Sequence, residues 1–254
     1  MEKSVDYIVN RVMKHNFDLT VDMMLQPVFD TSTFKCVGCE MLMRGIHRRN
    51  HVAPNLFINR LEENGGIVSL GEHVIALAFS YLASAIAPLN HAFSLHVNIS
   101  PVQLNNAEFA GQVIALSEYY GVQPVRIVLE ITDNNILLDE QGLNSALRLR
   151  EAGFLLAWDD IHSVEILDEK LSRLETDFIK LDRSCFKESS STETVRIIEA
   201  AKAHEVDVIA EGVETFSQMK MLFNNDVKMA QGYLFSRPLD RDSFRKKYLL
   251  GEEG

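Results

Sequence analysis

The chain has 254 residues, 46% of them hydrophobic, and its 25 basic and 36 acidic side chains leave a formal net charge of −11. This length suits one large α/β domain as well as two small ones. The acidic balance argues against a non-specific binder of polymeric nucleic acid or of a membrane surface. We expect no apolar run to reach the roughly 18 residues of a membrane span, and we find no signal-peptide pattern at the start.

The chain contains three cysteines, an odd number that favours reduced thiols and a cytoplasmic protein. Cys36 and Cys39 form a C-x-x-C pair, a spacing that also occurs in zinc and redox sites. If residues 34–43 are a strand, residues three apart face opposite sides of it. We therefore expect these two thiols not to share a metal ion.

The first half of the chain predicts helices around one hairpin. Apolar residues at helical spacing predict an amphipathic helix over residues 2–16. Two apolar runs, 23–29 and 34–43, flank a polar turn and predict an antiparallel hairpin. Helices are expected over 54–63 and 71–87, the second ending at Pro88. We divide the chain into an N-terminal helix within residues 1–20 and a single barrel domain over 21–250.

The second half alternates strands and helices, which is typical of parallel βαβ units. We expect strands at 93–99, 125–131, 154–159, 177–181, 207–210 and 229–233. We expect helices at 107–120, 141–152, 165–174, 193–204, 216–224 and 241–249. Together with the hairpin, these elements predict an α/β fold, a TIM-type (β/α)8 barrel with one antiparallel strand. An open doubly wound sheet is the alternative.

The strand expected at 154–159 carries an apolar run straight into Asp159 and Asp160. Two adjacent carboxylates at the end of a buried strand repel each other unless a cation lies nearby. The pair therefore indicates a bound divalent metal ion, or two. The alternative is that both aspartates only open a polar loop.

In a barrel, the carboxyl ends of the strands meet at one rim, where catalytic groups gather. Nearly every expected strand brings a polar side chain to that rim: Glu40, Arg44, Asn98, Glu130, Asp133, Asp159, Asp160, Lys180, Asp182, Glu211, Glu214 and Gln231. Hard oxygen ligands favour Mg²⁺ or Mn²⁺. Two such ions roughly 3.5–4 Å apart activate a water and hold a phosphate for in-line displacement.

Three of these rim residues have expected roles in such a reaction. Asp159 is placed to bridge the two ions, and Lys180 is expected to hold the water or to neutralise charge in the transition state. Arg44 is suited to a forked contact with a phosphate oxygen. His96 shares a strand face with Asn98, and we expect it to be a core histidine rather than a ligand.

Eight segments, in order, resemble the motifs of the EAL-domain phosphodiesterases, which hydrolyse the bacterial second messenger cyclic di-GMP. The segments are Gln26-Pro27, 38–44 (Gly-Cys-Glu-Met-Leu-Met-Arg), 97–104, 129–132, Asp159-Asp160, 179–182, 210–214 and 231–235. The resemblance covers about residues 21–240. It implies a barrel with one antiparallel strand, two divalent cations (Mg²⁺ or Mn²⁺), the linear product pGpG and a homodimer.

The resemblance also implies a role for each matching residue. Glu40, Asn98, Glu130 and Asp159 resemble the ligands of one metal, and Asp159, Asp160 and Glu211 those of the second. Lys180 resembles the water-polarising lysine. Gln26 and Arg44 resemble the contacts to guanine and phosphate, and Gln231 and Asp182 are placed with the substrate. Asp133 and Glu214 are expected to support the loops.

The chain departs from the family pattern at three places. Met41 stands where the signature has alanine, and Asp133 stands where glutamate is usual. The glycine-containing loop that follows the aspartate pair in the family is replaced by residues 161–168, which contain no glycine. In the family this loop couples the metal site to the dimer interface. The alternative function is therefore a catalytically weak or inactive domain that binds cyclic di-GMP or a protein and regulates something else.

Overall fold

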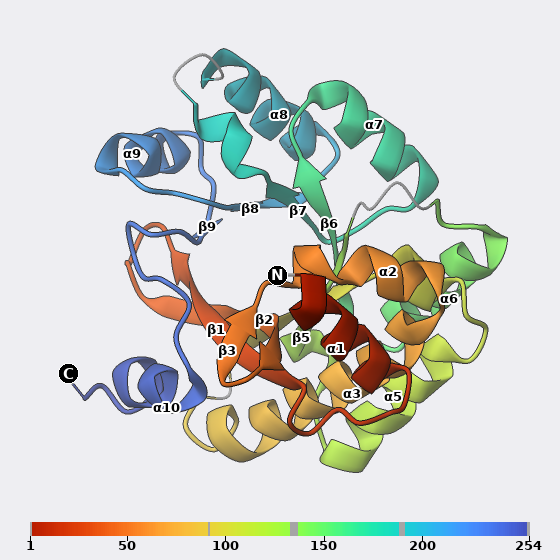
Figure 1. Cartoon of the computed structure of the whole chain (residues 1–254). Coiled ribbons are helices and arrows are strands. Elements are labelled where there is room, and N and C mark those ends of the chain that lie inside the picture. Colours follow the sequence, from red (N-terminus) through yellow and green to blue (C-terminus); the bar gives the residue numbers. More distant parts are fainter. Residues whose placement is uncertain (1, 91, 133–136, 188–190, 253–254) are drawn as a thin grey trace.

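The computed structural model describes residues 2–90, 92–132, 137–187 and 191–252. Eight strands close into a barrel surrounded by helices (Figure 1). In chain order they are β1 (Val21–Asp30), β2 (Cys36–His47), β4 (Ser94–Ile99), β5 (Ile127–Ile131), β6 (Leu155–Ile161), β7 (Phe178–Leu181), β8 (Asp207–Ala210) and β9 (Met229–Ala230).

The strand β1 pairs antiparallel with both of its neighbours, β2 and β9, and these two pairings close the barrel. The other barrel strands pair in parallel from β2 through β9. The predicted barrel with one antiparallel strand is therefore confirmed, and the open-sheet alternative is wrong. The short strand β3 (Asn50–Val52), which was not predicted, pairs with the end of β2 outside the barrel.

The helices that cover the barrel agree with the expected order, except that the short α4 was not predicted, and they differ at several ends. They are α2 (Ile58–Glu63), α3 (Gly66–Tyr81), α4 (Pro101–Leu104), α5 (Phe109–Tyr120), α6 (Glu140–Glu151), α7 (Val164–Arg173), α8 (Ser191–Ala203), α9 (Phe216–Asn224) and α10 (Arg241–Phe244). A short 3₁₀ turn precedes α2 because Pro54 fixes its start. The α3 helix begins before residue 71, directly after Gly65, whose φ of 77° separates it from α2.

The helical segment from Gly66 to Ile86 has 21 residues and a mean hydropathy of 1.5, enough to cross a membrane by length and composition. The expectation that no run is so long and apolar is therefore wrong. Half of its most apolar stretch is buried inside the structure, and α3 packs against α5, α2 and β4. A helix that is apolar nearly all round suits the core of a large domain as well as a membrane.

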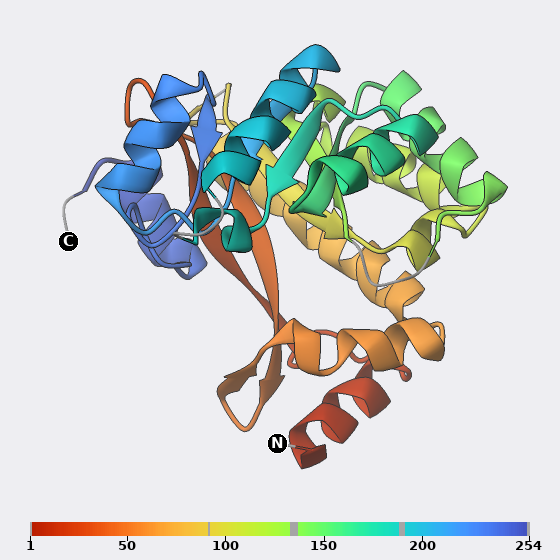
Figure 2. The same ribbon diagram turned by 90° about the horizontal axis from the view of Figure 1, so that it is seen from above.

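The N-terminal helix α1 (Glu2–Val12) lies away from the barrel centre. Figure 2 shows β1 and β2 running out of the barrel toward a layer made by α1, α2 and β3. The buried face of α1, which includes Ile8, belongs to the same apolar core as the barrel. A side chain at Gly45 of β2 would collide with Ile8, so this glycine lets the helix sit on the strand. The boundary between an N-terminal helix and a barrel domain stays a prediction.

Candidate active site

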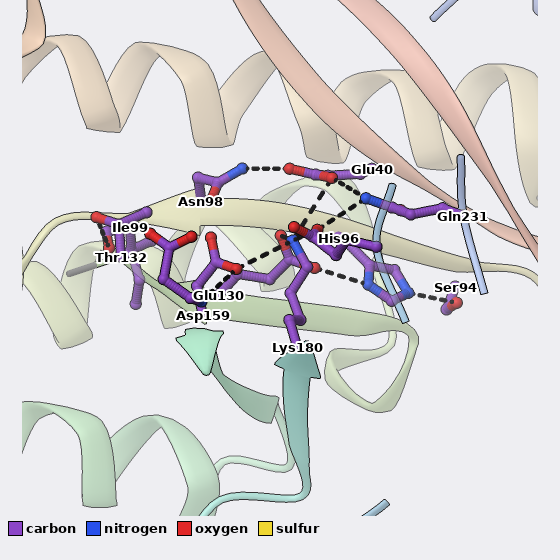
Figure 3. A network of polar contacts seen from close by, with 12 residues as sticks. Glu40, Ser94, His96, Asn98, Ile99, Glu130, Thr132, Asp159, Lys180 and Gln231 are labelled. Carbon is purple, nitrogen blue, oxygen red and sulfur yellow. Dashed lines mark hydrogen bonds and ion pairs between the residues drawn. The ribbon is translucent and has the colours of Figure 1, made fainter. Parts of the chain in front are cut away.

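Lys180, on β7, points into the barrel mouth among carboxylates from four other places in the sheet (Figure 3). Its Nζ lies 2.6 Å from Glu130 Oε2 and 2.6 Å from Glu211 Oε1. It also lies 3.5 Å from Glu40 Oε2 and 3.7 Å from Asp159 Oδ1. The lysine is 1% exposed. The predicted convergence of rim residues on one point is thus present in the structure.

Two amides hold Glu40 in place. Asn98 Nδ2, on β4, donates a hydrogen bond of 2.7 Å to Glu40 Oε1. Gln231 Nε2 donates to Glu40 Oε2 at 2.6 Å and to Glu211 Oε1 at 2.9 Å. Among the described residues, the buried Oε1 atom of Gln231 has no hydrogen-bond partner. Gln231 thus links Glu40 to Glu211 through its amide nitrogen.

Glu130 is held from the opposite side by a histidine. His96 Nδ1 lies 3.0 Å from Glu130 Oε1, and Ser94 Oγ lies 3.1 Å from His96 Nε2. Burial, followed by the positive charge of Lys180, lowers the pKa of His96 to about 3. The imidazole is therefore neutral. The expectation of a hydrogen-bonded buried histidine agrees with this geometry.

The charged groups at the centre strongly shift one another's pKa values. Burial by itself lowers the pKa of an ammonium group, but the surrounding carboxylates outweigh it and raise the pKa of Lys180 well above its usual range. Burial raises the pKa of Glu130 and of Glu211 well above the ordinary carboxyl value, and Lys180 offsets only part of this. For Glu40, burial is outweighed by Lys180 and the two amide donors, so its pKa is lowered.

Asp159 and Asp160 lie on a bulge of β6. Between Trp158 and Ile161, three steps along β6 correspond to two along β7. Asp160 takes the left-handed conformation, with a φ of 58°, which aspartate tolerates better than most residues. A bulge of this kind turns neighbouring side chains out of the regular alternation. Both carboxylates therefore reach the rim from adjacent positions, and β6 continues two residues beyond its predicted end.

A buried lysine of the next helix supports this bulge. Lys170 Nζ donates a hydrogen bond of 2.8 Å to the backbone oxygen of Asp159 and lies 5.3 Å from the centroid of the Trp158 ring. Asp160 stands further out, and partial burial, then the charges of Asp159 and Asp182, raise its pKa to about 6.

Two cavities flank Glu40 at the barrel mouth. The larger, of about 530 Å³, lies between α2, α3 and the ends of β2 and β4, and Asn98 and Asp160 are on its wall. The smaller, of about 270 Å³, brings together seven residues singled out in the sequence: Gln26, Glu40, Asp159, Asp182, Glu211, Glu214 and Gln231. Tyr233, which is 53% exposed, also borders the smaller cavity.

Three other predicted site residues differ in their surroundings. Arg44 is half-buried on β2, and its Nη1 donates to the backbone oxygen of Met43 at 2.8 Å. Glu214 is exposed, at the edge of the smaller cavity. Asp133 lies outside the described residues.

The segment 161–168 forms a strand end and a helix start rather than an extended loop. Ser163 caps α7, its Oγ accepting a hydrogen bond from the backbone of Ile166. His162 Nδ1 lies 3.0 Å from the backbone oxygen of Asp160. The segment therefore needs no glycine to leave the rim.

The donors at the rim fit a divalent cation. Carboxylate and amide oxygens are the ligands that Mg²⁺ and Mn²⁺ prefer. Lys180 Nζ already occupies a point at which four carboxylates converge, which shows that the cluster accommodates positive charge. Among the described residues, no three acidic, histidine or cysteine side chains form a ready-made cage for an ion. Lys180 Nζ therefore lies at the point where the carboxylates that would bind a cation converge.

The C-x-x-C pair takes no part in this site. Cys36, Cys39 and Cys185 are free thiols, and Cys39 is fully buried. The Cys36 Sγ contacts the backbone oxygen of Gly38. Burial raises the pKa of Cys36 to about 12 and that of Cys185 to about 11.

The fold and the rim define an EAL-type barrel, and the chain belongs to that family. The profile of the EAL domain matches residues 14–238. Members of this family use divalent cations and are typically cyclic di-GMP phosphodiesterases.

Two proteins similar to this chain carry names that fit this family. The chain is 32% identical over 229 residues to PdeN of Escherichia coli, named a probable cyclic di-GMP phosphodiesterase, covering 86% of this chain and 43% of PdeN. It is 27% identical over 244 residues to the cyclic di-GMP phosphodiesterase PdeL of Escherichia coli, covering 91% of this chain and 66% of PdeL. The chain thus spans less than two thirds of either relative.

Solved structures share the fold. The EAL enzyme Bd1971, in a form with cAMP and cyclic di-GMP bound, superposes with a TM-score of 0.86 at 25% identity, covering 96% of this chain and 69% of that one. Klebsiella pneumoniae BlrP1, in a complex with calcium and cyclic di-GMP, has a TM-score of 0.73 at 22% identity, covering 87% of this chain and 56% of that one. The second likeness bears on the fold alone.

Two residues that shape the site were not predicted as such from the sequence. His96 was expected in the core, but its contact with Glu130 was not expected, although both face the barrel interior. Lys170, which is buried on the apolar face of α7 beside Leu167 and Leu171, was not singled out. A lysine at a buried helical position was the available signal, because lysine is almost never buried without a partner.

Proposed function

We propose that this chain is a metal-dependent phosphodiesterase that hydrolyses cyclic di-GMP to linear pGpG. The observation that carries the proposal is the convergence of Glu40, Glu130, Asp159 and Glu211 on the Lys180 ammonium at the barrel mouth. These carboxylates, with Asn98 and Asp160, would hold two divalent cations, which would supply an activated water and neutralise the phosphate charge. Membership of the EAL family supports the same reaction.

The chain's own residues have separate tasks in this reaction. Asn98 and Gln231 orient Glu40 through their amide donors. Lys180 donates hydrogen bonds at the centre and offsets negative charge as the attacking water loses its proton. Arg44 contacts a phosphate oxygen.

The two cavities suit the shape of this substrate. Cyclic di-GMP carries two guanine bases around a ring that contains two phosphodiesters. Spaces of about 530 and 270 Å³ on either side of Glu40 offer room for a base on each side of the scissile bond. Gln26, on the wall of the smaller space, is assigned to the guanine edge.

The test is turnover of cyclic di-GMP by the purified chain with Mg²⁺ or with Mn²⁺, its products separated by anion-exchange chromatography. We expect pGpG as the first product, formed only when a divalent cation is present. Asp159→Asn should reduce kcat by at least about 10²-fold, because it removes a charged group that contacts the reacting centre. The matched control is Glu169→Gln, an exposed acid on α7, which should leave kcat unchanged.

Absence of product with both metals would contradict the proposal. Tight nucleotide binding without product, measured by calorimetry, would instead identify the chain as a cyclic di-GMP receptor that regulates a partner. The glycine-free segment 161–168 motivates that second candidate, since it replaces the loop that follows the aspartate pair in the family.

A further inference from the structure

Polar contacts connect Ser94, His96, Glu130 and Lys180 in the barrel interior. Ser94 Oγ lies 3.1 Å from His96 Nε2, and His96 Nδ1 lies 3.0 Å from Glu130 Oε1. The other oxygen, Glu130 Oε2, accepts a hydrogen bond of 2.6 Å from Lys180. Each oxygen of Glu130 thus has its own partner, and the histidine holds the one that faces away from Lys180.

The contacts determine which nitrogen of His96 carries the proton. Glu130 can bind a cation only as an ionised carboxylate, which accepts hydrogen bonds and donates none, so in that state Nδ1 must donate to Glu130. A neutral imidazole then has its lone pair on Nε2, which needs a donor. The Ser94 hydroxyl supplies that donor. The opposite tautomer would set a lone pair of Nδ1 against Glu130 Oε1.

The chain makes room for this pair at a glycine of the neighbouring strand. Gly38 of β2 is the register partner of Ser94 on β4, and Glu40 is the partner of His96. A side chain at Gly38 would collide with Ser94 Oγ and approach His96 Nε2. The glycine two residues before Glu40 therefore leaves space for the serine–histidine pair.

We propose that Ser94 and His96 are positioning residues that hold one oxygen of Glu130, so that the other oxygen is presented to a divalent cation at the rim. The inference rests on the proposed function in one respect, that Glu130 is a metal ligand. A ligand carboxylate that is fixed by a hydrogen bond loses less freedom when the ion binds. His96 is buried and acts through its contact with Glu130.

The test compares two replacements of His96 that differ in one hydrogen-bond donor. In His96→Asn, the side-chain amide places an N–H near the position of Nδ1, so the contact with Glu130 is retained. In His96→Leu, an apolar group of similar bulk fills the space without a donor. Calorimetric titration with Mn²⁺, in the absence of nucleotide, should show affinity lowered about 10- to 100-fold in His96→Leu. His96→Asn should stay within about threefold of the wild type, and Ser94→Ala should lie between them.

A second measurement locates the proton directly. Nitrogen NMR of the ¹⁵N-histidine-labelled protein with Mg²⁺, which is diamagnetic, should show the His96 proton on Nδ1, and Ser94→Ala should weaken that preference. A proton on Nε2, or equal Mn²⁺ affinities in the asparagine and leucine variants, would overturn the inference. Wild-type protein that binds Mn²⁺ without turnover would contradict only the proposed function. Wild-type protein that binds no Mn²⁺ would overturn both.

Discussion

Lys180 is the residue on which the charge balance of the rim depends. It is buried, with two carboxylate oxygens at 2.6 Å and two more within 3.7 Å. Removing one partner of a buried ion pair leaves uncompensated charge in a medium that solvates it poorly. The lysine therefore stabilises the metal-free protein, whatever it does in the reaction.

Lys180→Met should lower the free energy of unfolding of the metal-free protein by about 3–5 kcal/mol. Added Mn²⁺ should restore more stability in this variant than in the wild type, because the cations replace the missing charge. Thermal unfolding with and without Mn²⁺ measures both effects. Lys202→Met, at an exposed position, is the control. Equal stability of Lys180→Met and the wild type without metal would contradict this account.

At the same scale, the sequence predicted which residues belong to the site, but not all of the contacts between them. Motif order was enough to single out Glu40, Asn98 and Gln231, because each follows a recognisable strand pattern. That Gln231 bridges Glu40 and Glu211 could not be predicted, since the bridge depends on β9 lying beside both β1 and β8. Contacts between strands distant in sequence follow from closure of the barrel.

At the scale of the element, the bulge in β6 positions the aspartate pair, and α7 supports it. Lys170→Met should lower the free energy of unfolding by about 1–3 kcal/mol, because the buried backbone oxygen of Asp159 loses the donor Lys170. Chemical denaturation measures the change, and Lys220→Met, exposed on α9, serves as the control. A loss no larger than that of the control would show that α7 does not support the bulge.

The sequence predicted the order of the strands and helices, but not always the residues at which they begin and end. Alternation of apolar runs and helical patterns predicted each barrel strand. The bulge was not predictable, because Trp158-Asp159-Asp160 reads as a regular strand end. Its extra residue appears only in the pairing with β7, where Asp160 takes a positive φ.

At the scale of the whole molecule, barrel closure brings together groups that are nearly 200 residues apart in the chain. Glu40 and Gln231 are separated by 191 positions and share a hydrogen bond of 2.6 Å. The fold class followed from the sequence because one hairpin and six alternating units leave few ways to cover an eight-stranded sheet. The exterior features, such as β3 beside the end of β2, did not follow, because a three-residue strand carries too little pattern.

We expect these converging carboxylates to hold a pair of divalent cations. The most direct test is a count of Mn²⁺ bound per chain by calorimetry, with electron paramagnetic resonance to detect coupling between ions. We expect two Mn²⁺ per wild-type chain, coupled at roughly 3.5–4 Å, and the loss of that coupling in Asp159→Asn. A wild-type chain that binds no Mn²⁺, or that binds single uncoupled ions unaffected by Asp159→Asn, would contradict it.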